Sequence, residues 1–174
     1  WIATELVDGA QTLAQAIAVR GPIPADRAAE LVELIGEALI EAAQVGVVHR
    51  DLAPKNVLFS GHDVKLVNFS LPVPGDVPGV TDFVAPEQGE GKPVDQRSNL
   101  YSLGAIYYFV LTGQVVVPDL KKTTPGGTIP PPSKILPSSI AAGSAIEGAI
   151  VRALDRPPGA DRGSGRPFGA PRRQ

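Results

Sequence analysis

The sequence predicts a mainly α-helical domain with a small β-hairpin, and three patterns indicate this class. Residues 25–45 carry acidic or amide side chains every three or four positions on an otherwise apolar background, as in an amphipathic helix with one polar face. Residues 97–112 are apolar nearly all round, which is typical of a buried helix. Two short apolar runs flank residues 60–63, a polar and glycine-containing hairpin signal. With 174 residues, the chain is long enough to build one hydrophobic core.

The first part of the chain is expected to hold a strand and two helices. Residues 1–7 are largely apolar and lead into a turn signal, so they predict a strand. A short helix is expected over residues 13–19. The longer helix over residues 25–45 should begin after Pro24 and stop at Gly46, because proline suits a first helical turn and glycine a C-terminal cap.

The second part alternates loops with two more helices. Residues 70–82 are rich in Pro and Gly and predict a loop. The buried helix that follows has Asp95 near its start and Gly113 after its end, both favourable capping residues. Residues 121–137 carry many prolines without periodicity and predict another loop. Helical spacing returns over residues 140–154.

Composition excludes several classes of function. The chain has no Cys and two His, so disulfides, cysteine nucleophiles and thiolate metal sites are excluded and a zinc site is not expected. No apolar run approaches the ~20 residues of a membrane span. The net charge is -2, while residues 156–174 hold five Arg and one Asp. This balance predicts a disordered basic tail at 156–174 and gives no general case for nucleic-acid binding.

Four short motifs follow one another in a diagnostic order. They are His49-Arg50-Asp51 with Asn56, Asn68-Phe69-Ser70, Ala85-Pro86-Glu87, and the stretch from Asp95 to Gly104. In this order they resemble the protein kinase superfamily, and in particular the bacterial eukaryotic-type Ser/Thr protein kinases. The resemblance implies a protein-kinase-like fold. Residues 1–155 would form the mainly α-helical C-terminal lobe with small β-hairpins, beginning at the hinge strand, with the N-terminal β lobe missing.

The resemblance also implies catalytic roles for Asp51, Lys55 and Asn56. Asp51 would accept or orient the proton of a substrate hydroxyl, and Lys55 would approach the transferred phosphate as a point charge. Asn56 would give an oxygen ligand to a second magnesium ion. The structural alternatives stay open: Asp51 and Asn56 could serve only to brace the loop, and Lys55 could be a solvated lysine.

ATP and Mg²⁺ are the cofactors that the resemblance implies. The backbone of Glu5 and Val7 would bond the adenine edge, and Leu58 would form an apolar floor beneath the purine; ordinary strand and core packing is the alternative. Asn56 and Asn68 would be the metal ligands. Asn68 stands where the family carries a magnesium-binding aspartate, so the full charge that a hard dication prefers is lost.

Further residues have structural roles in this interpretation. We expect His49 to be buried, and Asn99 to accept one hydrogen bond from the catalytic-loop backbone in place of the family's aspartate. Glu87 would pair with a late arginine, Arg162 or Arg166.

The function implied is ATP-dependent phosphorylation of protein Ser/Thr residues by a cytoplasmic parent protein. The partner would be a protein substrate or a regulatory protein. The substitutions at Ala53, Asn68, Val80 and Asn99 leave a second hypothesis, a pseudokinase that acts as a binding or regulatory scaffold with weak or no nucleotide binding. A third hypothesis is a truncated, unstable fragment with no function of its own. In every case, we expect this fragment alone to be inactive.

Overall fold

The computed structural model describes residues 7–60, 63–69, 82–89, 91–116, 131–134 and 144–155. Four helices of two turns or more form its body: α1 (Leu13–Arg20), α2 (Ala25–Gln44), α4 (Gln96–Thr112) and α6 (Ser144–Asp155). The shorter elements are β1 (Gln11–Thr12), β2 (Val57–Ser60), β3 (Asp63–Leu66), α3 (Pro86–Gly89) and the 3₁₀ turns η1 (Pro54–Asn56) and η2 (Pro132–Lys134). None of the helices in this part of the chain combines the length and the apolar character that a membrane span needs.

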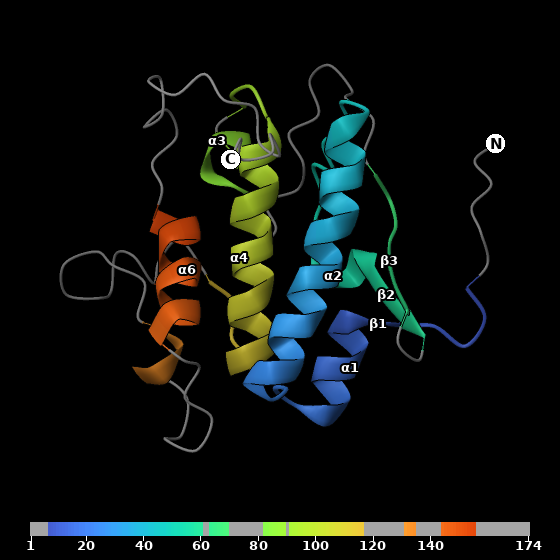
Figure 1. The fold of residues 1–174 in the computed structure, drawn as a ribbon, viewed down its shortest axis with the longest axis vertical. Coiled ribbons are helices and arrows are strands. Elements are labelled where there is room, and N and C mark those ends of the chain that lie inside the picture. The colour runs from blue at the N-terminus through green and yellow to red at the C-terminus, as the bar shows by residue number, and fades with distance from the viewer. Residues whose placement is uncertain are drawn as a thin grey trace, which may run out of the picture.

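Helix α4 is the centre of the domain, with α2 packed on one side of it and α6 on the other (Figure 1). The apolar segment predicted this helix, and its burial on almost every face confirms the prediction. The Asp95 carboxylate caps its first turn by accepting from the Arg97 N–H at 2.8 Å. Gly113 ends the helix in the left-handed conformation, with φ of 69°, which glycine adopts without a steric cost.

Helix α2 confirms the helix that its polar face predicted over residues 25–45. It runs from Ala25 to Gln44 and buries Ala28, Ile35 and Leu39, which lie on one face at helical spacing. The chain leaves the helix at Gly46, whose φ of 74° requires the freedom of glycine. This end matters for function, because the polar loop over residues 49–56 starts three residues later.

The three strands form one small antiparallel sheet in the order β1-β2-β3. The hairpin of β2 and β3 was predicted, and its register pairs Leu58 with Lys65. Strand β1 was not predicted. Its Thr12 pairs with Leu58 and also caps α1, where Thr12 and Gln15 exchange hydrogen bonds in a capping box. Residues 1–6 of the predicted first strand lie outside the described residues, and Val7 is not in a strand.

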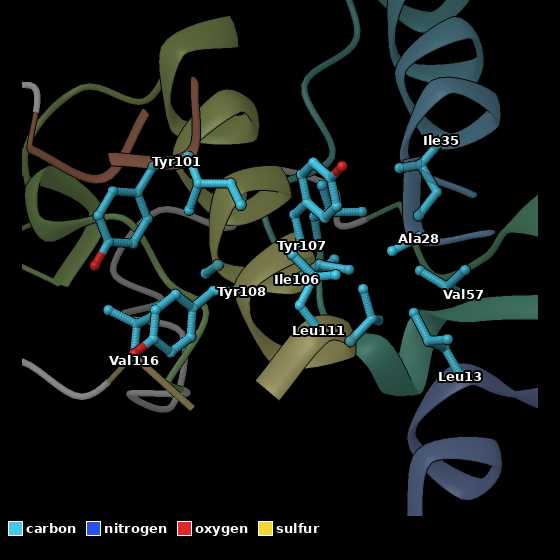
Figure 2. Packing of buried hydrophobic residues seen from close by; sticks show 14 of the residues in the cluster. Leu13, Ala28, Ile35, Val57, Tyr101, Ile106, Tyr107, Tyr108, Leu111 and Val116 are labelled. Atoms are coloured by element: carbon cyan, nitrogen blue, oxygen red, sulfur yellow. The ribbon is translucent and has the colours of Figure 1, made fainter. Parts of the chain in front are cut away.

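The hydrophobic core runs from α1 and β2, beneath α2, to the far face of α4 (Figure 2). Val57 anchors the sheet end of this core and is fully buried, next to Ala28 and Ile35 of α2. Ile106 and Leu111 of α4 lie in the middle, and the ring of Tyr108 packs toward Val116. The start of β2 is thus packed into the core, and the polar loop lies immediately before it.

The remaining predictions concern the later part of the chain. Helix α6 agrees with the helix predicted over 140–154, although residues 140–143 lie outside the described residues. Of the predicted loop at 121–137 the structure describes residues 131–134, and residues 132–134 form the 3₁₀ turn η2. The predicted loop at 70–82 and tail at 156–174 fall almost wholly outside the described residues.

Candidate active site

The polar loop between α2 and β2 is anchored by His49. Its side chain is fully buried, as expected, and its ring lies against that of Phe69, with centroids 4.3 Å apart. Burial lowers the pKa of His49, because desolvation disfavours the imidazolium, and the nearby Asp51 charge opposes this only in part. The next residue, Arg50, has φ of 67° and turns the chain so that Asp51 follows in a half-exposed position.

The three predicted catalytic residues are brought together by the turn η1. Lys55 Nζ lies 3.1 Å from Asp51 Oδ2, and Lys55 is largely exposed. Asn56 is buried, and its Nδ2 donates to the Asp51 carbonyl oxygen at 2.7 Å and to Asp51 Oδ2 at 3.0 Å. The carboxylate therefore has one side occupied by a cation and an amide donor, and its position is fixed from within the loop.

Asn68 joins this group from the end of the β-hairpin. It adopts φ of 61°, a conformation that asparagine tolerates better than most residues, and its Nδ2 donates to Asn56 Oδ1 at 2.9 Å. The backbone supports the same contact, because the Val67 N–H donates to the Asn56 carbonyl oxygen at 3.0 Å. The two residues predicted as metal ligands are thus neighbours in space.

The donor set fits Mg²⁺ poorly. Both side chains are neutral amides, and the Asn56 oxygen is already engaged by the Asn68 N–H, whereas Mg²⁺ is usually bound through carboxylates and phosphates. Among the described residues, no group of three His, Cys, Asp or Glu could hold a metal ion. The assignment of Asn56 and Asn68 as metal ligands stays a prediction, and the hydrogen bond between them counts against it.

Three amide side chains hold the backbone of this loop and of the residues just before it. The His49 N–H donates to Asn99 Oδ1 at 3.3 Å, so the predicted role of Asn99 is confirmed. Gln96 Nε2 donates to the Val47 carbonyl oxygen at 2.9 Å, and Gln88 Nε2 donates to the carbonyl oxygen of Arg50. Neither glutamine was predicted to take part, because nothing in the local sequence signals a contact with a loop some forty to fifty residues away.

Glu87 has one partner among the described residues that was not predicted, and its predicted pairing with a late arginine stays a prediction. Its Oε1 accepts from the Ser98 Oγ–H at 2.6 Å, which ties the short helix α3 to the first turn of α4. The predicted partners Arg162 and Arg166 lie outside the described residues. Ser98 was not predicted to have a role, although it is almost fully buried.

The predicted adenine-contacting residues are only partly described. Leu58 lies half-buried in β2, opposite both Thr12 and Lys65. Val7 is half-buried and its carbonyl accepts from the Ala10 N–H at 3.2 Å, across the turn at Gly9. Glu5 lies outside the described residues. The nucleotide-binding roles of these three residues therefore stay predictions.

A buried His49, an Asp51 held by Lys55 and Asn56, and a hairpin ending at Asn68 define a site of the protein kinase type. The family model described as "Protein kinase domain" matches residues 1–128 of the 174, and the chain belongs to this family. This confirms both the resemblance and the fold class that it implied.

Individual relatives support the bacterial branch of the family. The serine/threonine-protein kinase PknB of Mycobacterium leprae is 37% identical over 125 residues, which cover 66% of this chain and 20% of that protein. The serine/threonine-protein kinase Pkn1 of Myxococcus xanthus is 31% identical over 184 residues, which cover 91% of this chain and 25% of that protein. This chain therefore spans about a fifth to a quarter of the length of these relatives.

Solved structures give the same answer. The kinase domain of Mycobacterium tuberculosis PknI matches with a TM-score of 0.63 and 26% identity, covering 84% of this chain and 54% of that one. Rad53 residues 1–466, crystallised with AMP-PNP, match with a TM-score of 0.52 and 29% identity, covering 64% of this chain and 29% of that one.

Proposed function

We propose that this chain is the substrate-facing lobe of a Ser/Thr protein kinase, and that the whole protein transfers phosphate from ATP to hydroxyl groups of a protein substrate. One observation carries the proposal: Asp51 is held by Lys55 and Asn56 within a loop that is braced from behind at His49. A loop that served only as a connection would not need so many fixed contacts around one half-exposed carboxylate. A cytoplasmic location, where ATP is available, agrees with this activity.

In this function, Asp51 receives the hydrogen bond of the substrate hydroxyl and orients its oxygen toward the phosphoryl group. Its Oδ2 is taken by Lys55 and Asn56, so the other carboxylate oxygen is the one placed for substrate. Lys55 Nζ lies beside this carboxylate and is exposed, so it can also approach the transferred phosphate. Mg²⁺, when bound to ATP, would neutralise charge on the phosphates.

A second candidate function is a regulatory domain that keeps the fold without transferring phosphate. The contact between Asn68 and Asn56 favours it, because an uncharged side chain stands where the family places a metal-binding carboxylate. In that case the whole protein would act by binding a regulatory protein partner, with weak or no nucleotide binding.

The experiment that separates these two functions is a phosphoryl-transfer assay on the intact protein, with labelled ATP and a generic Ser/Thr protein substrate. If the first function is correct, Asp51→Asn should lower the transfer rate by a factor of about 10²–10⁴, the range of general acid–base contributions. Asp63→Asn is the matched control, because it makes the same chemical change at an exposed position of the hairpin and should leave the rate unchanged. No transfer by the wild type, or equal rates in all three proteins, would reject the kinase proposal.

A further inference from the structure

The hydrogen bonds that link Asn68, Asn56 and Asp51 can run in only one direction. The backbone carbonyl of Asp51 accepts and never donates, so the atom of Asn56 that lies 2.7 Å from it must be the amide nitrogen. The other atom of the same carboxamide, the one facing Asn68, must then be the oxygen. It follows that Asn68 presents its own nitrogen, which donates at 2.9 Å.

The oxygen of Asn56 is therefore bonded to the positive end of an N–H group. A divalent cation bound to this oxygen would face the same N–H hydrogens, which repel it. The Asn56 carboxamide cannot rotate to turn its oxygen away from Asn68, because the side chain is buried and its nitrogen donates to two atoms of Asp51. The carboxylate of Asp51, which Asn56 contacts, is already partly neutralised by Lys55 Nζ at 3.1 Å.

The same contact has a mechanical consequence. Asn68 follows Val67, whose N–H donates to the backbone carbonyl of Asn56 at 3.0 Å, so the hairpin and the polar loop share a backbone and a side-chain hydrogen bond. Two segments that a shared cation could connect are connected directly. The connection needs no ion.

We propose that the Asn56–Asn68 amide pair takes the place of a divalent cation. The pair holds the β-hairpin on the polar loop and excludes Mg²⁺ from this position. Asn68 is then the residue that prevents a divalent cation from binding at this position, because its N–H group occupies the Asn56 oxygen. The proposal concerns the two side chains alone and does not depend on whether the protein transfers phosphate.

The first test is a double-mutant cycle on the intact protein with Asn56→Ala, Asn68→Ala and the double variant, following the unfolding transition of this domain. The two residues should be coupled by a factor of about 2–12 in the unfolding equilibrium constant, the usual range for one hydrogen bond. The coupling should be equal in EDTA and in millimolar MgCl₂. A coupling that is absent in EDTA and arises only with Mg²⁺ would overturn the proposal, since both residues would then be metal ligands.

The second test measures free Mn²⁺ by electron paramagnetic resonance, with Mn²⁺ alone as the probe. Wild type and Asn68→Ala should take up the same amount of Mn²⁺, because the Asn56 oxygen freed in Asn68→Ala is one neutral ligand and does not hold the ion by itself. Asn68→Asp should take up more, because a carboxylate replaces the donor and can bind the ion. Mn²⁺ bound by the wild type and lost in Asn68→Ala would overturn the proposal, and so would an Asn68→Asp variant that binds no more than the wild type.

These readouts are separate from the transfer assay. A protein without transfer activity but with a metal-independent coupling would reject the proposed kinase function and leave the amide pair intact. Transfer activity together with a Mg²⁺-dependent coupling would do the reverse.

Discussion

The backbone N–H of His49 donates to Oδ1 of Asn99, fifty residues later in the chain, at 3.3 Å. Asn99 Nδ2 donates in turn to Gln96 Oε1 at 2.9 Å, and Gln96 Nε2 donates to the Val47 carbonyl at 2.9 Å. Every orientation is fixed, because the chain starts at an N–H and ends at a carbonyl. The first turn of α4 thus holds the polar loop through neutral amides, where the family's aspartate would supply a charge.

The first prediction is that restoring the family's aspartate, Asn99→Asp, destabilises this protein. The carboxylate would still accept from His49, but it could no longer donate to Gln96, and two oxygens would face each other in a nearly buried position. An unsatisfied buried group typically costs ~1–3 kcal/mol. Urea unfolding at neutral pH should show a loss of about this size.

The opposed oxygen of Gln96 can be tested directly. In a Gln96→Ala background that oxygen is gone, so Asn99→Asp should cost clearly less than it does in the wild type. Equal costs in the two backgrounds, or a stabilised Asn99→Asp protein, would show that the direction of the amide chain does not matter.

The second prediction concerns the link between α3 and α4. Ser98→Ala removes the donor to the Glu87 carboxylate at 2.6 Å, and hydrogen bonds to charged groups contribute ~1.5–3 kcal/mol. Ser102→Ala is the matched control one turn later, because its hydroxyl donates at 2.7 Å to the neutral carbonyl of Phe83. We expect the Ser102 variant to lose about 0.5–1.5 kcal/mol. A smaller loss for Ser98 than for Ser102 in denaturant unfolding would contradict the charge assistance.

How much of this could be read from the sequence depends on how local each signal is. Helix α2 was predicted because its polar residues recur at helical spacing, and helix α4 because its sequence is apolar nearly all round. Strand β1 was missed because two residues have no period, and it exists only through its pairing with Phe59 and Leu58. Helix α3, four residues long, has no pattern that a sequence could show.

The site divides in the same way. Asp51, Lys55 and Asn56 lie within six residues of one another, so their motif also brings them together in space. The contacts of Gln88 and Gln96 could not be predicted, because these side chains reach the loop only after α3 and α4 have packed beside it. Asn68 was recognised by its motif, yet its hydrogen bond to Asn56 depends on a left-handed backbone at the end of β3 that the sequence does not reveal.

The third prediction tests the packing of α4 on α6 with a pair of glycines. A Cβ at Gly104 would lie 2.9 Å from the Cβ of Ala153, so Gly104→Ala must push the two helices apart. Overpacking of this kind costs ~1–3 kcal/mol. A Cβ at Gly36 of α2 would meet nothing within 4 Å, and there the change to Ala should stabilise by about 0.5–1 kcal/mol, the helix-propensity difference. Two changes of the same sign in thermal unfolding would refute the assigned contact.

The fourth prediction is a pH dependence of stability that comes from His49. Burial lowers the pKa of this imidazole in the folded state, while in the unfolded chain it returns to about 6.5. The unfolded state therefore binds the proton more tightly, and the free energy of unfolding falls as the pH drops below about 6.5, by at most ~1.4 kcal/mol per pH unit. Above that pH both states are neutral and His49 contributes no slope.

His49→Phe keeps a ring beside Phe69 but cannot titrate. The difference between the unfolding free energies of wild type and His49→Phe should be constant from about pH 8 to 7 and should change steadily below about 6.5. If that difference stayed flat down to about pH 5.5, where carboxylates begin to titrate, His49 would have to ionise as easily in the folded protein as in the unfolded chain.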